Sequence, residues 1–219
     1  MKKLVIFGNR QFAQLAKYYF EKDSIYKVVA FTVDKDYITE ESFEGLPVLP
    51  FEGIEEVYSP LEYEIFIAVG YTDMNRLREK KFYEAKSKGY RLATYISSKT
   101  NYLSQYKCGE NCFILEGNTI QAYVKIKDNV IVWSGNLVAH HSIIHSHSYI
   151  SCHVVIAGNC EVESNCFLGV NSTIADGVRI ARGTLVGAGA VITKDTEPDS
   201  VYVPPRSIKL DKKSWDIDL

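Results

Sequence analysis

The chain has 219 residues, a formal net charge of -2 and 46% hydrophobic residues. This length allows two small domains, each with its own core, and we expect that arrangement. The near-neutral charge provides no field that would attract a nucleic acid or an anionic membrane surface. No apolar stretch approaches the roughly 20 residues that span a bilayer. We therefore expect a cytoplasmic protein with no nucleic-acid partner and no membrane insertion.

Strand-like and helix-like segments alternate in the first part of the chain. The first apolar run, KKLVIFG, stops at Gly8, Asn9 and Arg10, too early for a signal sequence, and therefore predicts a strand. Strands that alternate with helices form a parallel α/β sheet. We predict a small Rossmann-like parallel α/β domain over residues 1–98. Its strands and helices are expected, in chain order, at 2–8, 13–23, 28–34, 64–70, 74–89 and 91–97.

Three of these strands end in residues suited to a ligand crevice, namely Gly8, Asp34 and Gly70. Ligands of parallel α/β sheets bind at the carboxyl ends of the strands. A dinucleotide fingerprint would read G-x-G-x-x-G, whereas this chain reads GNRQFA, so we do not expect NAD. The helix N-terminus at 10–13 can still offer N–H groups to a diphosphate, and Arg10 can add a bidentate contact. The alternative is an α/β cap with a purely structural role.

From about residue 106 to Asp195 the sequence repeats every six residues. This period fits neither an amphipathic helix nor a half-buried sheet, and it predicts one short strand and one corner per hexad. The Asn, Gly and Asp residues near the hexad ends tolerate the left-handed backbone of tight corners. Three hexads make one triangular coil, and stacked coils share one aliphatic core. The third residues of the hexads are Cys108, Ile114, Ile120, Ile126, Val132, Val138, Ile144, Ile150, Ile156, Val162, Leu168, Ile174, Ile180, Val186 and Ile192.

This repeat resembles the hexapeptide-repeat acyltransferases over nearly all of residues 106–205. The resemblance implies a left-handed parallel β-helix over residues 99–219, with a short C-terminal tail, and a homotrimer whose catalytic pockets lie between neighbouring helices. The stretches LVIFG, IFIAVG and AGNCEVESNCFLGVNSTI resemble bacterial nucleotide-sugar N-acetyltransferases and sialic acid O-acetyltransferases. In that branch the front domain holds the nucleotide, which implies that Gly8, Asp34 and Gly70 line its site.

All histidines of the chain fall within a short stretch of the repeat. Acetyl transfer to an amine needs a proton acceptor near pH 7, and imidazole is the side chain best suited to that task. Counting eighteen residues per coil puts Gly158 directly over His140, one layer of about 5 Å away. The Gly158 N–H is therefore expected to hold the thioester oxygen. The resemblance implies the same pair, because aligning AGNCEVESNCFLGVNS sets the catalytic histidine on His140 and the thioester-binding glycine on Gly158.

The chain departs from the family pattern beside the expected base. Where the family carries Glu or Asp, this chain has His141, so the carboxylate that would orient the imidazole is missing. Glu161 or Glu163 is a candidate substitute. The second pocket histidine of the family falls on Tyr149, which can form hydrogen bonds but is no base near neutral pH.

A zinc site is an alternative interpretation of the histidine cluster. Carbonic anhydrases of the same β-helix type use two histidines five residues apart and a third about two coils earlier. His140 and His145 meet the first condition, but Ser104 stands at the second position. We therefore expect no metal, and we expect corner or solvent roles for His145, His147 and His153.

The later coils offer a candidate groove for acetyl-CoA. Gly187, Ala188 and Gly189 leave the backbone open to a thin pantetheine arm, and Lys194 and Arg206 are expected to meet the CoA phosphates. The alternative is that these are ordinary corner residues and solvated bases. The five cysteines are irregularly spaced, and we expect them to be reduced and structural.

These features together predict an acetyl-CoA-dependent sugar N-acetyltransferase of bacterial surface-glycan biosynthesis. It would present the amine of a nucleotide-linked amino sugar to acetyl-CoA, with His140 as base and Gly158 stabilising the oxyanion. The alternatives are a sugar O-acetyltransferase of the sialic acid type, a zinc-dependent β-helix enzyme, and a structural solenoid whose pocket has decayed. The residues expected to bind the sugar substrate are Gly8, Asn9, Arg10, Asp34, Gly70, His141 and Tyr149.

Overall fold

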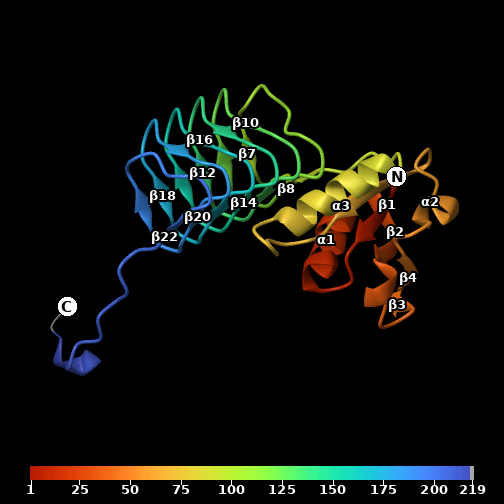
Figure 1. The fold of residues 1–219 in the computed structure, drawn as a ribbon, viewed down its shortest axis with the longest axis horizontal. Helices are drawn as coiled ribbons and strands as arrows, with labels where there is room; N and C mark the ends of the chain where they lie inside the picture. The colour runs from red at the N-terminus through yellow and green to blue at the C-terminus, as the bar shows by residue number, and fades with distance from the viewer. Residues whose placement is uncertain (218–219) are drawn as a thin grey trace.

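The computed structural model describes residues 1–217, which form an α/β layer followed by a stacked solenoid (Figure 1). The front sheet has the strand order β3-β4-β2-β1-β5. All its pairings are parallel except that of β3 with β4. The predicted parallel α/β front fold is thus confirmed, with one antiparallel strand added at the edge. Its strands are β1 (Lys2–Phe7), β2 (Tyr26–Val33), β3 (Ser42–Phe43), β4 (Leu46–Pro50) and β5 (Tyr63–Ile67).

Helices cover both faces of this sheet. Successive side chains of a strand point to opposite faces. Leu4 and Ile6 of β1 therefore pack in one cluster with α1, whereas Val5 and Phe7 pack in another with α3. No helix in the described part of the chain is both long and apolar enough to cross a membrane. The helices are α1 (Gln11–Lys22), α2 (Ile54–Val57) and α3 (Arg76–Ser87), with short 3-10 turns at Lys35–Tyr37 and Ser214–Asp216.

The second part of the chain is a left-handed parallel β-helix, as predicted. Its strands are two residues long and form sheets of seven, six and four strands. These strands are β6 (Tyr95–Ile96), β7 (Asn101–Tyr102), β8 (Phe113–Ile114), β9 (Thr119–Ile120), β10 (Lys125–Ile126), β11 (Ile131–Val132), β12 (Leu137–Val138), β13 (Ile143–Ile144), β14 (Tyr149–Ile150), β15 (Val155–Ile156), β16 (Glu161–Val162), β17 (Phe167–Leu168), β18 (Thr173–Ile174), β19 (Arg179–Ile180), β20 (Leu185–Val186), β21 (Val191–Ile192) and β22 (Val201–Tyr202).

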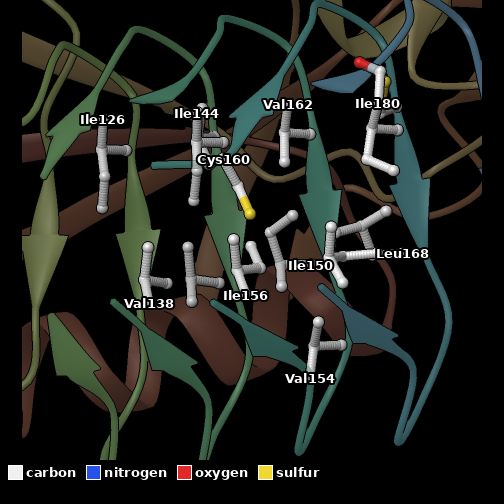
Figure 2. Packing of buried hydrophobic residues seen from close by; sticks show 14 of the residues in the cluster. Ile126, Val138, Ile144, Ile150, Val154, Ile156, Cys160, Val162, Leu168 and Ile180 are labelled. Carbon is white, nitrogen blue, oxygen red and sulfur yellow. The ribbon is translucent and has the colours of Figure 1, made fainter. Parts of the chain in front are cut away.

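The register of the coils follows the repeat. Ile131 pairs with Phe113 on one side and Tyr149 on the other, so stacked residues are eighteen apart in sequence. The third residues of the hexads line a single core, in which all of them except Cys108 are buried. Figure 2 shows rows of these side chains running along the solenoid. One such row contains Ile126, Ile144, Val162 and Ile180.

The corners form three edges along the solenoid, each built from two-residue turns. The docking edge contains the turns 110–111, 128–129, 146–147, 164–165 and 182–183. The glycine edge contains 116–117, 134–135, 152–153, 170–171 and 188–189. The histidine edge contains 122–123, 140–141, 158–159 and 176–177. Many second turn residues have positive φ, as expected for tight corners.

The cysteines have a structural role within these coils. The thiols of Cys112, Cys160 and Cys166 each donate to a carbonyl fifteen residues later, as the hydroxyls of Ser142 and Ser148 also do. Burial raises the pKa of the Cys160 thiol and raises that of Cys166 to about 12. These thiols are therefore protonated and act as small donors inside the core.

The front domain sits on the seven-stranded sheet, whose strands run from the docking edge to the glycine edge. Rings of α1 make this contact: Phe12 lies 5.5 Å and Phe20 6.3 Å from the ring of Phe113, between centroids. One apolar cluster joins α1, β1 and the outer side chains of that sheet. The histidine edge is the corner of the triangle that is not part of this covered face.

Helix α3 holds the docking edge through a buried guanidinium. Arg78 is fully buried, and its Nη atoms donate to the carbonyls of Gly70, Asn129, His147 and Ser148. Burial lowers the pKa of Arg78 to about 9, so the side chain stays charged at neutral pH. Backbone carbonyls therefore supply the solvation that water would otherwise give this charge.

Two local expectations about the front domain were incomplete. The predicted last strand at 91–97 splits between the domains: Leu92 forms a single bridge to Ile65, whereas Tyr95–Ile96 pairs with β8 of the solenoid. The predicted division at residue 98 thus falls between two strands that both stack on solenoid strands. Strands β3 and β4 were not predicted.

Candidate active site

The His140 ring lies directly against the bare backbone of Gly158. An atom at the Cβ position of residue 158 would be 2.7 Å from Cε1 and 3.0 Å from Nε2 of His140. Only a residue without a side chain leaves room for the imidazole there. The eighteen-residue count therefore placed this pair correctly as neighbours on the histidine edge.

The backbone N–H of Gly158 has no hydrogen-bond acceptor within residues 1–217. At two comparable corners a side chain nineteen residues earlier accepts this bond: Gln121 accepts from the N–H of His140, and Glu163 from that of Arg182. The corresponding residue for Gly158 is Ala139, whose methyl group accepts nothing. The chain thus leaves one amide donor unpaired beside the His140 ring.

His141 takes the place next to the base that a carboxylate was expected to fill. Its Nδ1 lies 3.2 Å from Nδ1 of His140, and its ring stacks on Tyr123 with centroids 4.6 Å apart. If His140 donates from Nδ1 to His141, its Nε2 keeps a lone pair. That lone pair lies on the side that faces Gly158. Neither suggested substitute is nearby, because Glu161 pairs with His145 and Glu163 with Arg179.

The remaining histidines are spread around the triangle. His145 lies at the end of a strand of the four-stranded sheet, His147 is buried at the docking edge, and His153 lies over Gly135 on the glycine edge. The corner role holds for His147 and His153, although His147 is buried rather than solvated. Among residues 1–217, no three His, Cys, Asp or Glu side chains are grouped as a metal site would require.

The carboxyl ends of β1 and β5 form a second candidate region, in the front domain. The chain leaves β1 toward β2 on one side and later adds β5 on the other, so the strand order reverses at this point. Gly8 has φ 129, and a Cβ there would come within 3.0 Å of the Ala68 carbonyl. The loop therefore needs glycine to reach the start of α1, where the Asn9 side chain donates to the Tyr37 carbonyl and Arg10 is exposed.

Two predicted ligand residues of the front domain already have internal partners. The Asp34 carboxylate lies 2.6 Å from Nζ of Lys81, a buried side chain of α3. The Gly70 carbonyl accepts a hydrogen bond from Arg78. Both residues stand at strand ends as predicted, but these particular groups are engaged in holding α3.

An aromatic group closes the space between the front domain and the seven-stranded sheet. The exposed ring of Tyr71 lies 5.2 Å from that of Tyr149 and 5.1 Å from that of Phe167, between centroids. Burial raises the pKa of Tyr149 to about 12, so its hydroxyl is a neutral donor or acceptor. Tyr71 was not identified from the sequence, because the rings that it contacts, Tyr149 and Phe167, lie far along the chain.

The expected acetyl-CoA residues occupy three separate places. Gly187 pairs through its N–H with the Tyr202 carbonyl, and Ala188 and Gly189 form a turn of the glycine edge. Lys194 is exposed and follows the strand β21, in line with the histidine edge. Arg206 is exposed in the tail beyond β22, which leaves the last coil as an extended segment (Figure 1).

A single chain does not bring all the candidate residues together. His140 and Gly158 lie on the histidine edge and Lys194 lies in line with it, whereas the front-domain residues and Tyr149 lie at the opposite, covered sheet. Two hollows of about 760 and 740 Å³ lie along α1 and between α3 and the docking edge, and neither is lined by His140. The candidate residues of the chain therefore form two groups on different sides of the solenoid.

Comparison with known proteins supports this reading of the repeat. Residues 159–194 match the family model described as bacterial transferase hexapeptide, six repeats. This segment is a hexapeptide-repeat region. It covers the coils that carry Asp176 and the candidate CoA residues near Gly187, and it begins one residue after Gly158. No curated protein sequence is significantly similar to the chain.

Solved structures share the whole fold around the hexapeptide-repeat region. The acetyltransferase domain of PglB from Neisseria gonorrhoeae is 23% identical with a TM-score of 0.81, covering 93% of this chain and 97% of that one. PerB from Caulobacter crescentus, solved with CoA and GDP-perosamine, is 23% identical with a TM-score of 0.80, covering 93% and 95%. WeeI from Acinetobacter baumannii is 20% identical with a TM-score of 0.60, covering 93% and 97%. The expected combination of an α/β front domain and a hexapeptide β-helix is confirmed.

Proposed function

We propose that this protein is an acetyltransferase that moves the acetyl group of acetyl-CoA to the amine of a nucleotide-linked amino sugar. The observation that carries the proposal is the His140 imidazole beside the unpaired N–H of Gly158. The shared fold adds support, because PerB was solved with CoA and GDP-perosamine and the PglB domain with acetyl coenzyme A. The reaction would serve the assembly of a bacterial surface glycan, in the cytoplasm.

The proposed mechanism uses one base and one oxyanion donor. The amine lone pair attacks the thioester carbonyl carbon, and the new C–N bond forms while His140 Nε2 takes a proton from the amine. The Gly158 N–H stabilises the negative charge on the carbonyl oxygen. The C–S bond then breaks, and the CoA thiolate takes the proton from His140. The products are the acetamido sugar and free CoA thiol.

The nucleotide is proposed to bind in the front-domain crevice, at Gly8, Asn9 and Arg10. The N-terminus of α1 offers unpaired N–H groups to a diphosphate, and the exposed Arg10 offers a fork of donors. Tyr71 and Tyr149 lie next to this crevice and would contact the sugar. Asp34 and Gly70 lie at the carboxyl ends of their strands and are proposed to line the crevice.

A homotrimer is proposed because the two groups of candidate residues need a neighbouring chain to meet, and because one of the two uncovered faces of the solenoid is apolar. The outer residues of the four-stranded sheet include the charged side chains Lys125, Glu161 and Arg179, which are favourably solvated. Those of the six-stranded sheet include Val155 and Val191, which are 37% and 64% exposed. The six-stranded sheet joins the glycine edge to the histidine edge. Packing a second copy there would set His140 of one subunit beside the CoA groove and front domain of the next.

The test is release of CoA thiol from acetyl-CoA with a panel of UDP-, GDP- and dTDP-linked amino sugars, and with sialic acid as a hydroxyl acceptor. We expect turnover with one amino sugar, and we expect His140→Ala to lower kcat by about 10² to 10⁴ without changing the oligomer. His145→Ala is the matched control, because His145 pairs with Glu161 away from Gly158. Turnover with sialic acid alone, or full activity of His140→Ala, would overturn the proposal.

A further inference from the structure

Asp176 reaches back over Gly158 toward the same point as His140. An atom at the Cβ position of residue 158 would lie 2.8 Å from Oδ1 of Asp176 and 3.0 Å from Nε2 of His140. The three residues follow one another at eighteen-residue steps along the histidine edge. His140 comes from the coil before Gly158 and Asp176 from the coil after it. The missing side chain of Gly158 thus leaves a gap between the imidazole and the carboxylate, which form no hydrogen bond or ion pair with each other within residues 1–217.

The Asp176 carboxylate has no other role in the described chain. Within residues 1–217 it forms no hydrogen bond and no ion pair. Two other aspartates that lean over a glycine are engaged: Asp128 accepts from the N–H of Glu110, and Asp199 pairs with Arg182. Asp176 is exposed, so its charge is solvated and costs little to keep beside His140.

We infer that Asp176 is the carboxylate partner of His140, replacing the acid that is absent at position 141. The inference rests on the proposed acetyl transfer. His140 becomes positively charged when it takes the proton of the amine, and a carboxylate facing Nε2 stabilises that charge. Asp176 itself takes no proton. The pair of imidazolium and carboxylate is neutral, so it does not oppose the negative charge that develops at the Gly158 N–H.

Asp176 and His141 therefore act on different sides of the ring. His141 contacts Nδ1 and sets which nitrogen carries hydrogen, while Asp176 faces the side of Cε1 and Nε2. Asp176 is a positioning and charge-balancing residue that works through His140. Its removal should lower kcat without changing KM for acetyl-CoA or for the sugar, because the carboxylate faces the base.

The test is a double-mutant cycle in the full-length protein. We expect Asp176→Asn to lower kcat by about 10- to 100-fold with KM little changed, and Asp176→Glu to recover part of that loss. In the His140→Ala background, Asp176→Asn should have no further effect, because its partner is gone. Asp199→Asn is the matched control, since Asp199 leans over Gly183 on the docking edge.

The outcomes separate this inference from the proposed function. If the wild-type protein transfers no acetyl group to any acceptor, the proposed function fails. If the wild-type protein is active but Asp176→Asn equals it, or if Asp176→Asn and His140→Ala reduce kcat independently, only the role of Asp176 is overturned. Equal melting temperatures of wild type and Asp176→Asn show that the comparison reports chemistry and not folding.

Discussion

At the scale of single residues, the candidate site depends on two small residues. Gly158 makes room for the His140 ring, and Ala139 leaves the Gly158 N–H without an acceptor. Gln121 stands one coil before Ala139 in the same register, and its amide oxygen accepts from the N–H of His140. Most first turn residues of the described corners also lack an acceptor for the N–H, so the feature particular to residue 158 is an unpaired N–H next to an imidazole ring.

This dependence gives a direct prediction for residue 139. Ala139→Gln should place an amide oxygen on the Gly158 N–H, as Gln121 does on the N–H of His140. Occupying the oxyanion donor should lower kcat by about 10² to 10³. Steady-state kinetics and thermal melting provide the measurement. Ala139→Met has a similar length without an acceptor and should keep most of the activity; equal loss in both variants would contradict the role of the N–H.

Counting along the sequence was sufficient to find part of this site. The eighteen-residue step brought His140 to Gly158, and one further step leads to Asp176, which the sequence reading did not use. The step of nineteen that links Gln121 to His140 was not visible, because it depends on how a side chain turns at the corner. The substitutes suggested for the missing acid were wrong since Glu161 and Glu163 lie on a different face.

At the scale of elements, the repeat predicted the solenoid better than the alternating segments predicted the front domain. Aliphatic residues at every sixth position determine which side chains point inward, so the core could be named residue by residue, although the hand of the coil came from the family resemblance. The front sheet lacks such redundancy. Its edge strand β3 has two residues, and the neighbouring strand β4 has five, of which two are prolines, a residue type that sequence patterns seldom place in a paired strand.

The contact of α3 with the docking edge also could not be predicted from the sequence. It joins Arg78 to carbonyls that belong to residues 129, 147 and 148. Backbone groups carry no signal in the amino-acid pattern. His147 also belongs to this contact: its Nδ1 lies 2.8 Å from Nδ2 of Asn129 and its ring packs against Phe82.

The buried histidine predicts how stability responds to pH. Burial lowers the pKa of His147, an effect that Arg78 strengthens and that Glu79 and Asp128 oppose. In the unfolded chain the pKa returns to about 6.5, so the unfolded state binds the proton first as the pH falls. The free energy of unfolding should therefore decrease as the pH drops below about 6.5.

Melting curves between pH 7.5 and pH 5 test this effect. His147→Asn should reduce the pH dependence, because the Asn side chain does not titrate. The substitution should fit the corner, because Asn111, Asn129 and Asn165 have similar positive φ values on the same edge. His153→Asn is the control, since His153 also has positive φ but lies on the glycine edge. A pH dependence that is identical in wild type and His147→Asn would contradict the assignment.

At the scale of the whole molecule, the proposed activity requires an assembly. The front domain covers the seven-stranded sheet, and the histidine edge lies across the solenoid from it. A sugar bound in the front domain of one chain is therefore proposed to meet His140 of another. The uncovered six-stranded sheet with Val155 and Val191 is the face on which that neighbour would pack.

A charge on this face should separate the subunits. Val155→Lys would place an ammonium group in the proposed apolar contact, where burying it without a partner is unfavourable. We expect a folded monomer by light scattering and loss of acetyl transfer. Lys125→Glu, on the exposed outer side of the four-stranded sheet, should leave both properties unchanged. A Val155→Lys protein that remains a trimer would contradict the placement of the interface on the six-stranded sheet.

The most direct test of the shared site is activity from two inactive variants. His140→Ala removes the base, and Arg10→Glu places a negative charge where the diphosphate is proposed to bind. After subunit exchange in an equimolar mixture, about one quarter of the sites should combine an intact His140 with an intact front domain from a neighbouring chain. We predict recovery of about that fraction of wild-type acetyl transfer. A mixture as inactive as its two components would contradict a site formed between subunits.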